Sequence, residues 1–125
     1  MVILVASSGE QPLKPGVYEA VITGIEERER DGQPYLLWSF EVRYAPQRTT
    51  VVRRPTSLKL GPRSLTRAFV EAALGRPLRD GEKVDTDTLV GAKVRVVVNR
   101  ATRPDGSEAN RIESVLPVEE DELPF

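Results

Sequence analysis

The sequence contains 125 residues, enough for one domain with one hydrophobic core. It contains no cysteine and no histidine, which excludes disulfides, thiolate metal sites, cysteine nucleophiles and the most common general base. The net charge of −1 conceals an asymmetry, because without the four acids at 119–122 the chain has 18 basic residues against 15 of its 19 acidic ones.

Residues 1–12 begin with a short apolar run and continue with serine, glycine and proline. The run lacks a basic leader and is too short to span a bilayer, so we expect a soluble, cytoplasmic protein. The segment 1–14 is predicted to be an extra edge strand or a flexible arm in front of a domain over 15–116. Residues 117–125 then form a separate tail.

A first strand is predicted to begin at Val17, after the turn residues 14–16. Apolar residues at 18, 20 and 22 lie on one face, and Gly24 allows the register to slip by one residue so that Ile25 rejoins that face. The strand continues through the charged segment 26–30. Asp31-Gly32, followed by a proline, predicts a hairpin turn.

The second strand, 35–43, has the clearest pattern in the chain. Its even positions are all apolar and predict a core face: Leu36, Trp38, Phe40 and Val42. Its odd positions are mixed and available for binding. A β-prone segment follows at 49–54, and Pro55 is expected to end it.

One helix is then predicted, with Ser64 as its N-cap, apolar residues every four positions and Gly75 at its end. A loop over 76–91, with room for a single turn at 87–90, leads to strands at 92–99 and 110–116. Three strands, one helix and two strands is the order of the OB-fold, a mainly β, five-stranded barrel with one α-helix between strands 3 and 4. Another small barrel or an α+β sandwich has the same order of elements.

Seven basic residues and no acid lie between positions 42 and 70. Any one of them is readily explained as a solvated surface charge, but the uninterrupted set predicts a cationic groove for a nucleic-acid backbone. The phosphate-binding candidates are Arg43, Arg48, Arg53, Arg54 and Lys59. Arg63 and Arg67, at the start of the helix, are weaker candidates.

Aromatic residues that stack on bases are few. Tyr35 and Tyr44 lie at the ends of the second strand, outside its core positions, and are the best candidates. Trp38 has two interpretations: its parity predicts a core residue, whereas its place on the second strand of an OB-fold also suits stacking. Each stacked base contributes roughly 1–3 kcal/mol, so we expect modest affinity driven mainly by charge, which a homo-oligomer would raise.

The chain ends with four acids, Leu123, Pro124 and Phe125. Clustered acids stay solvated, while a proline-restricted aromatic end suits a pocket on a partner. An acidic run that ends in Leu-Pro-Phe resembles the C-terminal tip of bacterial and phage single-stranded-DNA-binding proteins. The resemblance implies an OB-fold body that holds DNA and a tip that recruits replication and repair proteins, here Asp121, Glu122, Leu123, Pro124 and Phe125. The alternative is a frayed terminus, and the family's long linker before the tip is missing.

These observations together predict sequence-independent binding of single-stranded DNA in replication, recombination or repair, in a bacterial cytoplasm or, for a phage protein, in the host's. No cofactor, metal or catalytic site is expected. The rival is an OB-fold interaction module that does not bind nucleic acid. A carboxylate- and Mg²⁺-dependent nuclease is the enzyme alternative, but the acids at 26–31 and 80–87 lie on a charged strand end and in turns, where solvated side chains are common.

Overall fold

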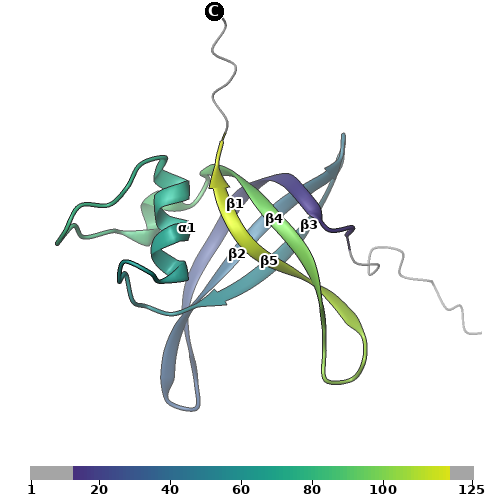
Figure 1. Ribbon diagram of the computed structural model, residues 1–125, viewed down its shortest axis with the longest axis horizontal. Helices are drawn as coiled ribbons and strands as arrows, with labels where there is room; N and C mark the ends of the chain where they lie inside the picture. The colour runs from purple at the N-terminus through teal and green to yellow at the C-terminus, as the bar shows by residue number, and fades with distance from the viewer. Residues whose placement is uncertain (1–12, 119–125) are drawn as a thin grey trace, which may run out of the picture.

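A computed structural model describes residues 13–118 of the chain. One antiparallel sheet and one α-helix account for its regular structure (Figure 1). The elements, in chain order, are β1 (Gly16–Arg30), β2 (Gln33–Ala45), β3 (Arg48–Thr56), α1 (Leu65–Leu74), the 3₁₀ turn η2 (Thr86–Leu89), β4 (Lys93–Thr102) and β5 (Glu108–Pro117). The predictions of a mainly β chain and of a helix between the third and fourth strands are confirmed.

The sheet is organised around β1. The strand order is β3-β2-β1-β4-β5, and β1 pairs with β4 over Gly16–Val21 and with β2 from Glu19 to its end. The β1–β2 register shifts between Ile22 and Gly24, so the predicted slip at this glycine is confirmed. The bulge turns Ile25 toward the core, against which it packs partly buried.

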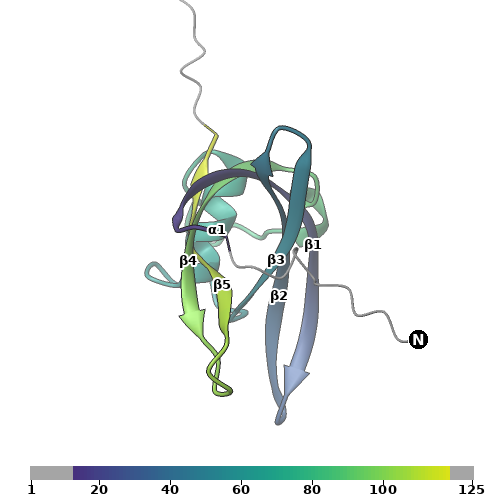
Figure 2. The same cartoon turned by 90° about the vertical axis from the view of Figure 1, so that its right-hand side faces the viewer.

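β3 and β5 are the two edges of this sheet and share no ladder of backbone hydrogen bonds. Strong curvature nevertheless brings the edges together (Figure 2), and some Cα atoms of β3 and β5 lie within 8 Å of one another. The sheet is therefore not closed as a barrel, and the predicted OB-fold barrel is not confirmed by the strand pairing.

The core lies between the inner face of the sheet and α1, which packs chiefly against β5. Trp38, Phe40 and Val42 are fully buried, as their alternation predicts. The ring of Phe69 from α1 meets both Trp38 and Phe40 edge-on, at centroid distances of 5.3 and 5.8 Å. This arrangement of rings is favourable for aromatic packing and fixes the helix against β2.

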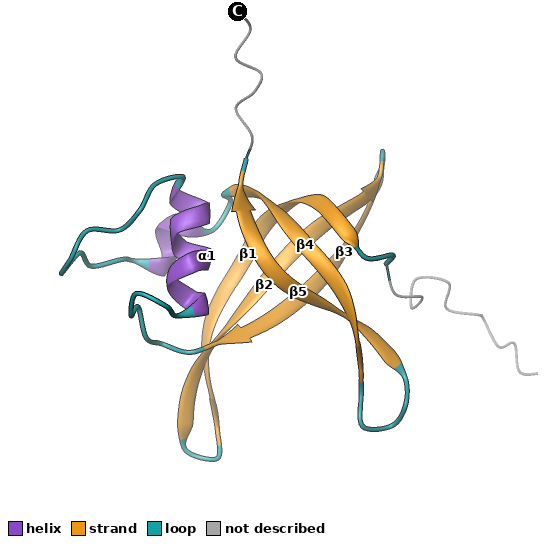
Figure 3. Ribbon diagram, viewed as in Figure 1, coloured by secondary structure: helices purple, strands orange, loops and turns teal. Residues whose placement is uncertain are grey.

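The helix begins and ends where the sequence predicts. Ser64 has extended backbone dihedrals, and its hydroxyl accepts a hydrogen bond of 3.1 Å from the amide of Arg67. Gly75 ends the helix in the left-handed region, with φ of 75°, where a residue with a side chain is strained. Loops of some length flank the helix on both sides (Figure 3).

Several strand boundaries differ from the predictions. β3 continues through Pro55, which lies opposite Leu37, so the expectation that this proline ends the strand is wrong. A proline is tolerated there because β3 is an edge strand, with no further strand beyond it that would need a hydrogen bond from a backbone N–H. β4 and β5 are each longer than predicted, since they continue past the β1 partner strand as a two-stranded hairpin.

Two carboxylates hold the loop after α1, one from the helix and one from the loop itself. Glu71 accepts hydrogen bonds from the amide of Leu78 at 2.8 Å and from Arg67 at 3.2 Å. Arg76 forms a two-point contact with Glu82, at 3.1 and 2.6 Å. Hydrogen bonds from Arg76 and from the amide of Arg79 lower the pKa of Glu82 from 4.5 to about 2.

This lowered pKa predicts a pH-dependent contribution to stability. A carboxylate with a depressed folded-state pKa stabilises the fold above its ordinary pKa of 4.5 and loses that effect as the pH falls toward about 2. Replacing Glu82 with glutamine is therefore expected to lower the urea midpoint at pH 7. The difference from the unmodified chain should narrow steadily below pH 4.5. A difference that is the same at neutral and acidic pH would contradict the assignment.

Candidate nucleic-acid interface

Two hairpin arms extend beyond the shared part of the sheet. β3 ends opposite Leu36, so the β1–β2 hairpin continues past it, and the β4–β5 hairpin continues past the start of β1. Asp31 and Gly32 at the first tip have positive φ angles of 51° and 80°, as in the predicted tight turn. Both arms project from the same side of the molecule in two perpendicular views (Figures 1 and 2).

The predicted phosphate-binding residues are spread along β2, β3 and the following loop. Arg43 and Arg53 lie on the outer face of the sheet, opposite Thr49 and Ser39 respectively, and both are exposed. Arg54 lies opposite Trp38 on the inner side and is half-buried. The remaining two are exposed at the ends of the region, Arg48 at the start of β3 and Lys59 in the loop after it.

The two tyrosines are accessible but far apart. Tyr35 is half-buried at the base of the first hairpin, where it pairs with Arg28, and Tyr44 is 40% exposed beside the β2–β3 turn. The two residues are nine positions apart along the strand, which corresponds to about 30 Å at roughly 3.3 Å per residue. One base cannot contact both rings, so a bound strand that uses them must follow the length of β2.

Trp38 belongs to the core and not to a binding surface. Its side chain is fully buried, it stacks on Phe40 with a centroid distance of 6.1 Å, and its indole N–H donates to the Thr56 hydroxyl at 2.7 Å. Of the two interpretations of Trp38, the core interpretation is the one the structure supports. Its inclusion among the DNA-binding candidates is corrected, because no exposed ring face remains for a base.

Arg67 also has a structural role. Its guanidinium donates to the carbonyls of Leu60 and Leu78, at 3.3 and 3.0 Å, and pairs with Glu71 at 3.2 Å. These contacts tie the segments before and after α1 to the helix. Arg63, the other weak candidate, is exposed in the turn before the helix.

Replacing Arg67 with glutamine is expected to destabilise the fold by about 1–3 kcal/mol, because two loop carbonyls lose a charged donor. The urea midpoint measures this loss. The affinity for a labelled oligo-dT should stay unchanged under native conditions, and a large loss of affinity in the folded variant would place Arg67 in the interface instead.

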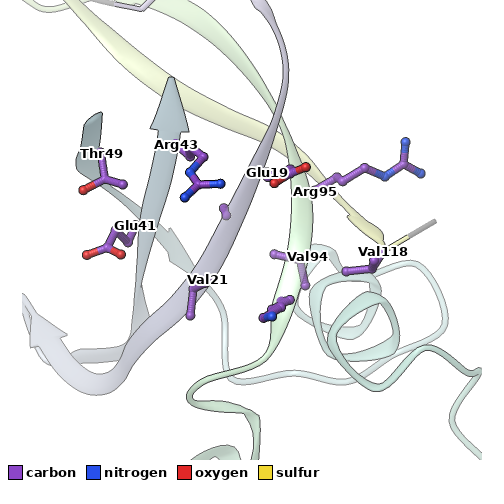
Figure 4. Close-up of a pocket in the computed structure, with 10 residues that line it drawn as sticks. Glu19, Val21, Glu41, Arg43, Thr49, Val94, Arg95 and Val118 are labelled. Atoms are coloured by element: carbon purple, nitrogen blue, oxygen red, sulfur yellow. The ribbon is translucent and has the colours of Figure 1, made fainter. Parts of the chain in front are cut away.

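A groove of about 630 Å³ runs over the outer face of the sheet where β1, β2, β3 and β4 meet (Figure 4). Arg43 and Thr49 contribute to it from β2 and β3, and Lys93 and Arg95 contribute from β4. Sequence reasoning missed Lys93 and Arg95, although they alternate with the buried Val94 and Val96 and so lie on the outer face by parity. Arg95 also donates to the carbonyl of Pro117 at 3.2 Å.

The segment that lacks acids along the chain is not isolated from acids in space. Glu19 lies opposite Arg43 in the β1–β2 pairing, and Glu41 lines the same groove. The groove thus combines three basic residues with two acids, and the sheet face around it carries mixed charge. The basic set that the sequence predicts is therefore divided between this mixed face and the β3 edge.

The acids considered for an enzyme have other partners in the structure. Glu26 pairs with Arg28 at 2.6 Å, and Asp85 caps η2 through a 3.0 Å hydrogen bond from the amide of Asp87. Within residues 13–118, no group of three or more acids is arranged to hold a metal ion. The same part of the chain contains no helix with the length and apolar character needed to cross a membrane.

The predicted partner-binding residues, 121–125, and the N-terminal segment 1–12 lie outside the described residues. Val118, the last described residue, lines the groove beside β4. The chain matches no protein-family model, and it matches no curated protein.

Proposed function

We propose that this chain binds single-stranded DNA without sequence preference, through an OB-type domain, during replication, recombination or repair. The observation that carries the proposal is the position of β3. This edge strand contains Arg48, Arg53 and Arg54. It runs beside β5 from the β2–β3 turn to the base of the first hairpin arm. A cationic strand edge suits a flexible polyanion better than a rigid duplex.

The connectivity supports an OB-type domain. β1 is shared between two halves of the sheet, the helix falls between β3 and β4, and the β3 and β5 edges approach each other without pairing. The OB-fold is a partly open five-stranded barrel that binds oligonucleotides through strands 2 and 3 and through the loops between strands 1 and 2 and between strands 4 and 5. Those loops correspond to the two hairpin tips described above.

The energetics favour a charge-driven complex. Tyr35 and Tyr44 are the aromatic candidates left once Trp38 is assigned to the core, so stacking contributes roughly 1–3 kcal/mol for each base that reaches one of them. Phosphate contacts by arginine release counterions and make affinity fall with salt. We expect affinity to depend on the length of the strand and little on its sequence.

Fluorescence anisotropy with end-labelled oligonucleotides tests the proposal. The label belongs on the DNA, because the buried Trp38 is a poor reporter of a surface complex. Oligo-dT should bind at low salt, and a duplex of equal length should bind more weakly. Comparing the affinities for oligo-dT and oligo-U in the same assay shows whether the chain prefers DNA or RNA. Absence of oligo-dT binding at low salt would leave the rival function, an interaction module that does not bind nucleic acid.

We further propose that residues 121–125 recruit replication or recombination proteins. Deleting 119–125 is expected to preserve or tighten oligo-dT binding, because four acids that repel the DNA backbone are removed with the tip. The same deletion should abolish capture of the partner proteins. Anisotropy and a pull-down with the full chain as control measure the two effects. A loss of DNA affinity on truncation would contradict this division of roles.

A further inference from the structure

The side chain of Asn110 on β5 holds the segment in front of β1. Its Oδ1 accepts a hydrogen bond of 3.0 Å from the amide of Leu13, and its Nδ2 donates to the carbonyl of the same residue at 3.2 Å. Opposite residues of an antiparallel strand pair exchange hydrogen bonds in this way. The Asn110 side chain therefore takes the place of a neighbouring strand and joins positions that are 97 residues apart in the chain.

Further contacts fix Leu13 and the residue after it. Arg100, opposite Asn110 on β4, donates from its Nε to the Leu13 carbonyl at 3.2 Å. The Tyr18 hydroxyl donates to the carbonyl of Lys14 at 2.5 Å. The side chains of Leu13 and Tyr18 are partly buried and pack against the core. These contacts connect the β4–β5 arm, residues 99–111, to the body of the domain beyond the end of its pairing with β1.

The β1–β2 arm, residues 28–35, has no comparable connection. Within residues 13–118, its side chains form no hydrogen bond or ion pair outside their own hairpin, where Arg28 pairs with Glu26 at 2.6 Å. Residues 28–34 are all exposed. A two-stranded hairpin without tertiary contacts is only marginally stable, so we expect this arm to move relative to the body.

We propose that Asn110 is a positioning residue for the bound strand. By anchoring Leu13, it makes the β4–β5 arm the rigid side of the site, and the β1–β2 arm is the side that closes on the DNA. The role in binding rests on the proposed function, in which the arms correspond to the binding loops of an OB-fold, whereas the anchoring does not. An arm that is fixed in advance loses less conformational entropy on binding, so Asn110 raises the affinity without contacting the DNA.

Amide hydrogen exchange in the full chain, followed by NMR, tests the anchoring. Protection factors in the β4–β5 arm should exceed those in the β1–β2 arm by about tenfold or more. Asn110→Ala should remove this difference and leave the core strands protected, and Asn110→Asp, which keeps the acceptor but not the donor, should have an intermediate effect. Asn99→Ala, the same substitution at an exposed position of the same arm, is the control and should change little. Equal protection of both arms in the unmodified chain, or full protection in Asn110→Ala, would overturn the anchoring.

Oligo-dT anisotropy tests the role in binding. Asn110→Ala should lower the affinity about 3- to 10-fold, because the strand must then order the arm. The slope of log affinity against log salt should stay unchanged, since no phosphate contact is lost. Asn99→Ala should bind normally. An unchanged affinity in Asn110→Ala, or a slope that falls by about 0.7 as for a lost phosphate contact, would overturn the positioning role.

The chain contains no cysteine, so pairs of spin labels on introduced cysteines can measure the movement of each arm. Gln33→Cys with Lys83→Cys relates the β1–β2 arm to the loop after α1, and Thr102→Cys with Lys83→Cys relates the β4–β5 arm to the same loop. Oligo-dT should change the first distance and leave the second unchanged. An unchanged first distance, or a second that changes as much, would overturn the assignment of the rigid and closing arms. If the unmodified chain fails to bind oligo-dT, the proposed function fails and the binding role of Asn110 with it, while hydrogen exchange still decides the anchoring.

Discussion

Replacing Trp38 with alanine is expected to lower the free energy of unfolding by about 3–5 kcal/mol, the range for a fully buried large aromatic residue. The indole is fully buried, stacks on Phe40 and receives the edge of Phe69. Its removal leaves a cavity between the sheet and α1. It also leaves the buried Thr56 hydroxyl without the indole donor at 2.7 Å.

Urea unfolding followed by far-ultraviolet circular dichroism measures this loss, and two variants control for it. Trp38→Phe keeps most of the ring volume and should cost clearly less than alanine, because the main loss is one buried hydrogen bond. Tyr35→Ala removes a ring that is only half-buried and should cost less still. Equal, small effects of Trp38→Ala and Tyr35→Ala would contradict the core assignment.

The same variants distinguish a core tryptophan from a stacking one. A chain with Trp38→Phe that remains folded should bind oligo-dT with unchanged affinity, since the ring lies away from the surface. Tryptophan emission should be blue-shifted and insensitive to added oligo-dT. Strong quenching of that emission by oligo-dT would show that the ring is accessible to bases.

Reversing the charges of Arg48 and Arg53 together is expected to weaken oligo-dT binding about 10- to 100-fold at low salt, because two phosphate contacts become two repulsions. Both side chains are exposed on β3, so the fold should remain intact. Anisotropy measures the affinity, and circular dichroism verifies the fold. The salt slope should decrease in magnitude by about 1.4, or about 0.7 for each contact.

A double variant at Arg79 and Lys83 provides the matched control. Both residues are exposed in the loop after α1, and reversing them changes the total charge by the same amount. If the interface lies along β3, this control should bind oligo-dT nearly as well as the unmodified chain. Similar losses in both double variants would mean that net charge alone, and no defined surface, determines the affinity.

Local patterns predicted most of the fold. Alternation in 35–43 identified the core face of β2, and the pair Ser64 and Gly75 identified both ends of the helix. The turn at Asp31-Gly32 and the register slip at Gly24 were predicted from equally local patterns. These features depend on neighbours along the chain, so a single sequence contains the information that they require.

Features that depend on pairing between distant strands were predicted less well. Pro55 remains in β3 because that strand is an edge, and edge position is a property of the whole sheet. Whether the edges β3 and β5 pair with each other likewise depends on how far the whole five-stranded sheet curves. The sequence order of the elements was therefore correct, whereas closure of the barrel could not be decided from it.

In the candidate site, too, local features were predicted and features that depend on distant strands were not. Arg43 and Arg53 share an exposed face, as their parity indicates. The Arg67 guanidinium, in contrast, donates hydrogen bonds to backbone carbonyls of the loops that flank its helix. The acids near the basic segment are Glu19 on β1 and Glu41 near the end of β2. Both lie outside 42–70, so spacing within that segment did not reveal them.

The central claim is that a cationic strand edge holds a single-stranded backbone, and the salt dependence of oligo-dT affinity tests it most directly. A plot of log affinity against log salt for the full chain should be linear, with a slope of about −2 to −3 for three or four phosphate contacts at about −0.7 each. A slope near zero, or no binding even at low salt, would contradict the claim.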